Sequence, residues 1–153
     1  HRNGFKILYN RKAIVYTQDP ATLHSYINQM RRWFGGGWQN LLKHYPVALS
    51  RPAKAMELSL LYIEGLVFSI LLFLVPILNF RLALLFALPS LAVGFMFAIY
   101  ASIKEKRSDL LLAPLPYIIL VYVNSYIFLE QFIKEVLFKR KNLIWFKPER
   151  VQI

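Results

Sequence analysis

Three long apolar runs limit what this chain can fold into. The first extends from Leu58 to Phe80 and contains one charge, Glu64, whereas Leu82 to Ile103 and Leu110 to Leu129 contain none. Each is close to the ~20 residues that a helix needs to cross a bilayer core. The chain is 57% hydrophobic and 18% charged, too apolar for an ordinary soluble domain. The sequence therefore predicts a mainly α membrane protein with about three transmembrane helices. The predicted spans are 58–80, 82–103 and 110–133, within a membrane region of 55–138.

The charges are concentrated before these runs. The formal net charge is +11, and residues 1–54 hold nine Lys or Arg and one acid. The positive-inside rule predicts a multi-pass protein of the cell membrane, with this basic region and the Lys104–Asp109 loop both cytoplasmic. The third run conflicts with the rule, because a full crossing would put Lys139, Arg140 and Lys141 outside. It can cross, bend back or lie tilted in the interface, and its hydrophobicity favours a crossing.

The N-terminal segments differ from the membrane region. Short β-branched and aromatic runs at 5–9 and 13–17 predict a hairpin, and residues 1–19 read as the last strands of a larger sheet. Asp19 is expected to cap a helix that begins with Pro20. Apolar residues then recur at helical spacing until Gly35–Gly37, which are expected to interrupt the helix. A basic, aromatic-rich amphipathic segment over 20–54 is typical of helices that lie at a membrane surface; packing on a soluble domain is the alternative.

Gln29, Arg32 and Trp33 are the most informative side chains, in the pattern Q-x-x-R-W. On a helix, positions i, i+3 and i+4 share a face. The Arg fork suits a diphosphate, Trp provides a flat surface for a sugar ring, and Gln can bond sugar hydroxyls. The alternative is a Trp anchored in the membrane interface, with the two arginines Arg31 and Arg32 binding lipid phosphates.

The order of these features resembles the end of the catalytic region of membrane-integrated family 2 glycosyltransferases, which include cellulose, chitin, hyaluronan and poly-N-acetylglucosamine synthases. The resemblance covers His1 to about Tyr45 and continues into the membrane helices. Its matching parts are Gly4-Phe5-Lys6-Ile7, a strand ending Tyr16-Thr17, Asp19-Pro20-Ala21-Thr22-Leu23, the Q-x-x-R-W helix and the glycine after it.

The resemblance implies an inverting transfer from a UDP-sugar, with N-acetylglucosamine favoured, and passage of the growing polysaccharide into the membrane. Arg32, supported by Gln29, would bind the donor diphosphate, and Trp33 would line the acceptor site. The general base and the D-x-D ligands of Mg²⁺ or Mn²⁺ would lie before His1 in a GT-A domain. The chain is therefore predicted to be a fragment with no catalytic or metal-binding residues of its own, inactive alone.

Other residues carry weaker predictions. Glu64 is a candidate channel residue, because an acid within a span usually faces protein or water; hydration near the interface is the alternative. Tyrosines could line a path for the product, although lipid contact is the more common role. They are Tyr62, Tyr100, Tyr117, Tyr122 and Tyr126. Within the basic tail 139–153, residues 145–150 resemble a Trp-containing tail or a gating loop, with an interfacial anchor as the alternative.

Two other classes of function stay open. One is a non-processive family 2 enzyme that glycosylates a lipid-linked acceptor, and the other is a non-enzymatic channel or transporter subunit. Membrane lipids are expected partners in each case, and an accessory membrane subunit is compatible with a synthase. Nucleic-acid binding is not expected, because no binding motif accompanies the basic residues. Cysteine is absent, and His1, His24 and His44 lack the spacing of metal ligands.

Overall fold

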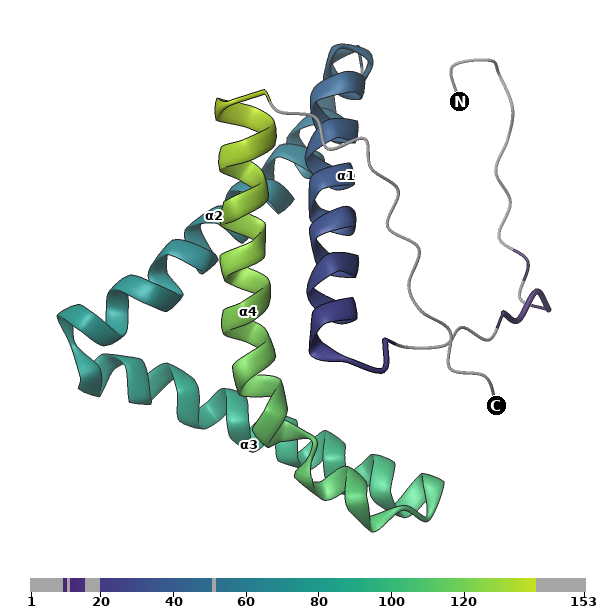
Figure 1. Cartoon of the computed structure of the whole chain (residues 1–153), viewed down its shortest axis with the longest axis vertical. Coiled ribbons are helices and arrows are strands. Elements are labelled where there is room, and N and C mark those ends of the chain that lie inside the picture. Colours follow the sequence, from purple (N-terminus) through teal and green to yellow (C-terminus); the bar gives the residue numbers. More distant parts are fainter. Residues whose placement is uncertain (1–9, 11, 16–19, 51, 140–153) are drawn as a thin grey trace.

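The computed structural model describes residues 10, 12–15, 20–50 and 52–139, and helices make up 88% of them. These residues contain no strand. The elements are the α-helices α1 (Leu23–Leu49), α2 (Pro52–Leu78), α3 (Phe80–Glu105) and α4 (Pro114–Phe132), the short 3₁₀-helix η1 (Ser108–Leu112) and the π-helical turn η2 (Ile133–Leu137). Figure 1 shows that α4 and η2 form one continuous rod.

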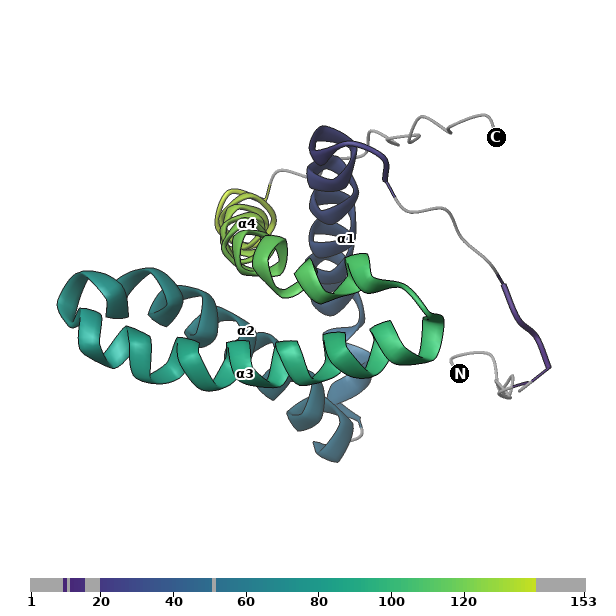
Figure 2. The ribbon, with the colours of Figure 1, turned by 90° about the horizontal axis from the view of Figure 1, so that it is seen from below.

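The helices form two layers. In one, α1 and α4 lie side by side and run in the same direction, whereas α2 and α3 form a hairpin in the other, with arms that diverge from the tip (Figure 1). Seen from below, α4 and α1 are viewed almost along their axes while α2 and α3 are viewed lengthwise (Figure 2). The α1–α4 pair therefore runs across the hairpin.

Three helical stretches are long and apolar enough to cross a membrane: Ala55–Leu78, Phe80–Glu105 and Pro114–Leu137. The prediction of three helices with the length and hydrophobicity of membrane spans is therefore confirmed, and it supports a multi-pass membrane protein. The break between the first two is at Asn79, whose side chain accepts a hydrogen bond from the Leu82 N–H (3.1 Å) and caps α3. The third stretch begins four residues later than predicted because Ser108–Leu112 form η1 and Pro114 occupies the first turn of α4.

Helix α1 differs from the prediction in two ways. It is a single 27-residue helix that continues through Gly35–Gly37 and past Pro46, so the expected interruption at the glycines is wrong. Its N-cap is Thr22, whose hydroxyl accepts a hydrogen bond from the Ser25 N–H (3.2 Å). The helix thus begins later than Pro20. Glycine weakens an isolated helix by about 1 kcal/mol, and packing against α2 and α4 offsets that cost here.

The predicted hairpin falls mostly outside the described residues. In the part that is described, residues 13–15 have no regular secondary structure, and a turn is present at Lys12. The Asn10 carbonyl accepts from the Ala13 N–H, and the Asn10 side chain accepts from the Lys12 N–H. Of the C-terminal tail, only Lys139 is described, so the roles suggested for 145–150 stay predictions.

Most of the large apolar side chains among the described residues are exposed. The buried apolar residues among those described are Met30, Trp38, Ala55, Ala98 and Ile127, whereas residues such as Ile77 (81%) and Phe97 (69%) face outward. Exposure of this extent is tolerated when lipid replaces water around the helices. The loop before α4 is held differently: the Arg107 guanidinium donates two hydrogen bonds to Asp109 (3.2 and 2.6 Å), and they lower the pKa of that carboxyl.

Candidate functional site

The Q-x-x-R-W residues lie in the first half of α1. Because the helix is continuous here, Gln29, Arg32 and Trp33 occupy adjacent positions on its surface. Gln29 and Arg32 are half-buried, and the Trp33 side chain is 56% exposed. The helix therefore presents an amide, a guanidinium and an indole together, with the indole outermost.

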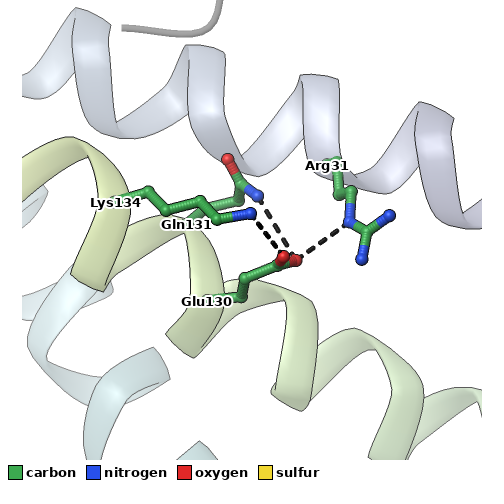
Figure 3. Close-up of polar contacts among 4 residues, drawn as sticks. All are labelled: Arg31, Glu130, Gln131 and Lys134. Atoms are coloured by element: carbon green, nitrogen blue, oxygen red, sulfur yellow. Dashed lines mark hydrogen bonds and ion pairs between the residues drawn. The ribbon is translucent and has the colours of Figure 1, made fainter. Parts of the chain in front are cut away.

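The neighbouring Arg31 has a different environment, because it contacts α4. Its Nε donates to Glu130 Oε2 (2.9 Å), and Lys134 Nζ donates to Glu130 Oε1 (2.6 Å). Gln131 Nε2 lies 3.5 Å from the same carboxylate. Figure 3 shows these side chains converging on Glu130 from α1 and α4. Since the side chain of Glu130 is only 15% exposed, the two cations compensate a carboxylate that has lost much of its solvation.

Further polar contacts extend this seam in both directions. The Tyr26 hydroxyl donates to Asn124 Oδ1 (2.9 Å) near the start of α1, and Gln39 Nε2 donates to Glu135 Oε2 (2.9 Å) just after the glycines. Gln131 and Glu135 are each only 3% exposed. Buried polar groups are costly unless they are hydrogen-bonded, so these contacts define one register between α1 and α4.

Two glycines let α1 approach its neighbouring helices α2 and α4 closely. A Cβ on Gly35 would lie 2.9 Å from Gln131 Oε1, and a Cβ on Gly37 would lie 2.9 Å from the Tyr62 hydroxyl. A Cβ on Gly36 would meet nothing within 4 Å. Small residues at helix contacts are characteristic of membrane proteins. The glycine triplet thus marks where α1 meets α2 and α4.

Trp38, three residues after Gly35, packs against the same two helices as the glycines. It is 4% exposed, and its ring lies 4.6 Å from Tyr62 and 5.1 Å from both Phe128 and Phe132, measured between centroids. Such tilted aromatic contacts stabilise beyond the area they bury. Its indole nitrogen has no hydrogen-bond partner among the described residues. Two tryptophans five positions apart therefore differ: Trp38 packs inside, and Trp33 faces outward.

The predicted channel residues have varied surroundings. Glu64 is exposed on α2, and no described residue pairs with it. Tyr62 packs on Trp38, Tyr122 packs edge-on against Phe73 (5.6 Å), and Tyr100 lies under Lys104 Nζ (5.9 Å). Tyr117 and Tyr126 are both exposed on α4.

Sequence reasoning missed the partners of α1. They are Glu130, Lys134 and Glu135, at the polar end of the third apolar run, where Glu130 and Lys134 are four residues apart and so share a helical face. The signal was present: polar residues at the end of an apolar run need a covering element. The sequence did not indicate which helix would supply it.

The described residues contain no group of three His, Cys, Asp or Glu side chains placed to hold a metal ion. Comparison with known protein families, with curated proteins and with solved structures finds no match for this chain.

Proposed function

We propose that this chain is the C-terminal membrane portion of an inverting, processive family 2 glycosyltransferase that polymerises a UDP-sugar and passes the product into the membrane. One observation carries the proposal: Trp33 is 56% exposed on a helix whose other tryptophan is buried, next to Arg32 and Gln29. A rigidly mounted, exposed indole beside a guanidinium suits a sugar and a diphosphate.

The rigidity of α1 supports this role. The helix contacts α2 and α4 on either side of the glycines, through Arg31 before them and through Trp38 and Gln39 after them. A binding site needs side chains that are already oriented before the ligand arrives. In this proposal Arg31 is a positioning residue, and Arg32 contacts the donor.

The reaction requires a base to deprotonate the acceptor hydroxyl, which attacks the anomeric carbon as the diphosphate leaves. Arg32 would donate hydrogen bonds to the departing diphosphate and stabilise its developing charge. Gln29 would support that contact, and Trp33 would hold the acceptor sugar against its ring face. The base and the ligands of the Mg²⁺ or Mn²⁺ that neutralises the diphosphate are expected before His1.

The test uses the full-length protein in lipid nanodiscs and measures UDP release from UDP-N-acetylglucosamine, UDP-glucose and UDP-glucuronate. Arg32→Ala and Trp33→Ala are each compared with a matched variant on the same helix, Lys43→Ala for the lost cation and Leu42→Ala for the lost exposed apolar group. Removing one preorganised donor to a developing charge lowers kcat by about 10²-fold. We expect a loss of this order for Arg32→Ala, a marked loss for Trp33→Ala, and near wild-type rates for the matched variants.

Two outcomes would overturn the proposal. If Arg32→Ala and Trp33→Ala retain the activity of their matched variants, the Q-x-x-R-W helix has no role in transfer. If no UDP-sugar is consumed by the folded full-length protein, the non-enzymatic subunit becomes the better reading. Product length separates the remaining alternative, because an enzyme acting once on a lipid-linked acceptor makes no polymer.

A further inference from the structure

Helix α4 crosses both arms of the α2–α3 hairpin, and the two crossing points can be compared. At one, Phe128 packs on Gly65 of α2, where an added Cβ would lie 3.0 Å from the ring. At the other, Pro114 packs on Gly94 of α3, where an added Cβ would lie 3.6 Å from the proline. Gly65 lies 14 residues before Asn79 at the hairpin tip, and Gly94 lies 15 residues after it.

The two crossing points are therefore at the same distance from the tip. Pro114 and Phe128 are 14 residues apart, which is about 21 Å along a helix. A helix that crossed the membrane beside the hairpin would meet its arms at depths that differ by most of that length. The three stretches therefore form the sides of a nearly equilateral triangle, and the two arms diverge from the tip by about 60°. Where both arms are inclined equally to the membrane normal, equal distances from the tip are equal depths, and α4 lies across the hairpin, as Figures 1 and 2 also show.

The order of the layers agrees with this orientation. In both views α4 lies between α1 and the side on which the hairpin tip is found (Figures 1 and 2). The polar side chains of α4 face α1, as Glu130 and Asn124 show. An exposed apolar stripe occupies the other side of α4, and its member Tyr122 reaches Phe73, six residues from Asn79. The stripe consists of Leu115, Ile119, Tyr122 and Tyr126.

The charge distribution is an independent argument. If α4 crossed, the basic run Lys139, Arg140 and Lys141 would be on the opposite side of the membrane from Lys104–Arg107. If α4 lies across, both basic segments are on the same side, as the positive-inside rule requires.

We propose that only α2 and α3 cross the membrane, and that α4 lies in the leaflet where α2 begins and α3 ends, with α1 on its water side. Fourteen residues of an arm inclined by about 30° place α4 about 18 Å from the hairpin tip along the membrane normal. A hydrocarbon core of about 30 Å then leaves α4 about 12 Å below the near boundary, slightly deeper than the ~5–10 Å typical of interfacial helices. Helix packing separates axes by about 8–10 Å, which puts α1 within about 4 Å of the boundary.

The partner of this surface is thus the acyl region of one leaflet. The apolar stripe of α4 contacts it, and α1 covers the polar face that α4 would otherwise expose to hydrocarbon. This inference depends on the membrane geometry alone. A failure to find transferase activity would not affect the proposed position of α4. Evidence that α4 crosses the membrane would likewise not affect the proposed function.

Depth measurements test the proposal directly. The sequence has no cysteine, so a single nitroxide label can be placed at Leu115→Cys, Ile119→Cys or Tyr126→Cys in the full-length protein reconstituted in liposomes. These three positions share one face of α4. For a helix that lies in the leaflet, oxygen and nickel accessibility should report the same depth at all three. For a crossing helix the depths should be graded over about 16 Å, and that gradient would overturn the proposal.

A second measurement determines the side of each segment. Ser108→Cys, Lys139→Cys and Leu78→Cys are exposed to a membrane-impermeant maleimide in sealed vesicles of known orientation. We expect Ser108→Cys and Lys139→Cys to react from the same side and Leu78→Cys from the other. Labelling of Lys139→Cys from the side of Leu78→Cys would show that α4 crosses. If a cysteine variant does not accumulate, a green fluorescent protein fused after Lys139 provides the same comparison against one fused after Ser108.

Discussion

Substitution of the glycines in α1 tests how its contact with α4 is formed. Gly35→Ala and Gly36→Ala make the same chemical change at adjacent positions of one helix. A Cβ at position 35 would lie 2.9 Å from Gln131 Oε1 and 3.7 Å from Glu135 Oε1, whereas a Cβ at position 36 meets nothing within 4 Å. Both neighbours of Gly35 are 3% exposed, so neither has open space into which it can move.

The expected magnitudes follow from these contacts. Each substitution gains about 0.8–1.0 kcal/mol of helix propensity, because alanine has less backbone freedom to lose than glycine. Overpacking a tight contact costs about 1–3 kcal/mol, and only Gly35→Ala incurs it. Gly36→Ala should therefore stabilise the protein by about 1 kcal/mol. Because the propensity gain cancels in the comparison, Gly35→Ala should be less stable than Gly36→Ala by about 1–3 kcal/mol.

The assay is reversible unfolding of the purified protein in detergent, followed by far-ultraviolet circular dichroism for helix content and by tryptophan fluorescence for the packing of Trp38. For both signals, the midpoint of unfolding should occur at a lower denaturant concentration for Gly35→Ala than for Gly36→Ala. If Gly35→Ala is as stable as Gly36→Ala or more so, the close approach of α1 to α4 at this position is wrong.

Three further predictions test other contacts. In a double-mutant cycle, Arg31→Ala and Glu130→Ala should show a coupling free energy of about 1 kcal/mol. The coupling should decrease as salt is added, because the pair is only partly buried. A coupling free energy of zero would contradict the contact. Glu64→Gln should leave the unfolding free energy within about 0.5 kcal/mol of wild type, since no described residue pairs with Glu64. Under the proposed function, the same substitution should shorten the polymer seen on gels. Unchanged product length and rate would show that Glu64 does not line the product path. The hydrogen bonds from Arg107 lower the pKa of Asp109. Their stabilising contribution is therefore present at neutral pH and is lost as the pH falls from the ordinary carboxyl pKa towards the lowered one. In an NMR titration, Arg107→Gln should raise the pKa of Asp109, and an unchanged pKa would show that the pair does not form in solution.

Several features could be read from the sequence because they depend on local properties. Runs of about 20 apolar residues become helices wherever lipid surrounds them, since every backbone polar group must then be satisfied within the segment. The Asn79 side chain that caps α3 also acts locally, because it accepts from the N–H of Leu82, three residues later. The spacing of Gln29, Arg32 and Trp33 required only that the segment be helical.

The glycine triplet shows where local reasoning failed. In isolation three glycines weaken a helix, and the sequence offers no sign that two of them receive neighbours from α2 and α4. Thr22 and Asp19 are both acceptable caps, so the start of α1 could be misplaced by a few residues. The Q-x-x-R-W pattern selects Arg32 from the adjacent pair of arginines, but only the tertiary structure pairs Arg31 with Glu130, 99 residues away.

The sequence alone determined that the protein is helical, that three segments are apolar enough for a membrane, and that an amide, a guanidinium and an indole share one helical surface. These follow from hydrophobicity and from a period of 3.6 residues, which act within one segment. The tertiary structure decided that α1 pairs with α4, which tryptophan is buried, and that α4 lies across the hairpin. Those outcomes depend on contacts between residues about 20 to 100 positions apart, where the close fit of glycines and the pairing of buried charges select one arrangement among many that the apolar pattern permits.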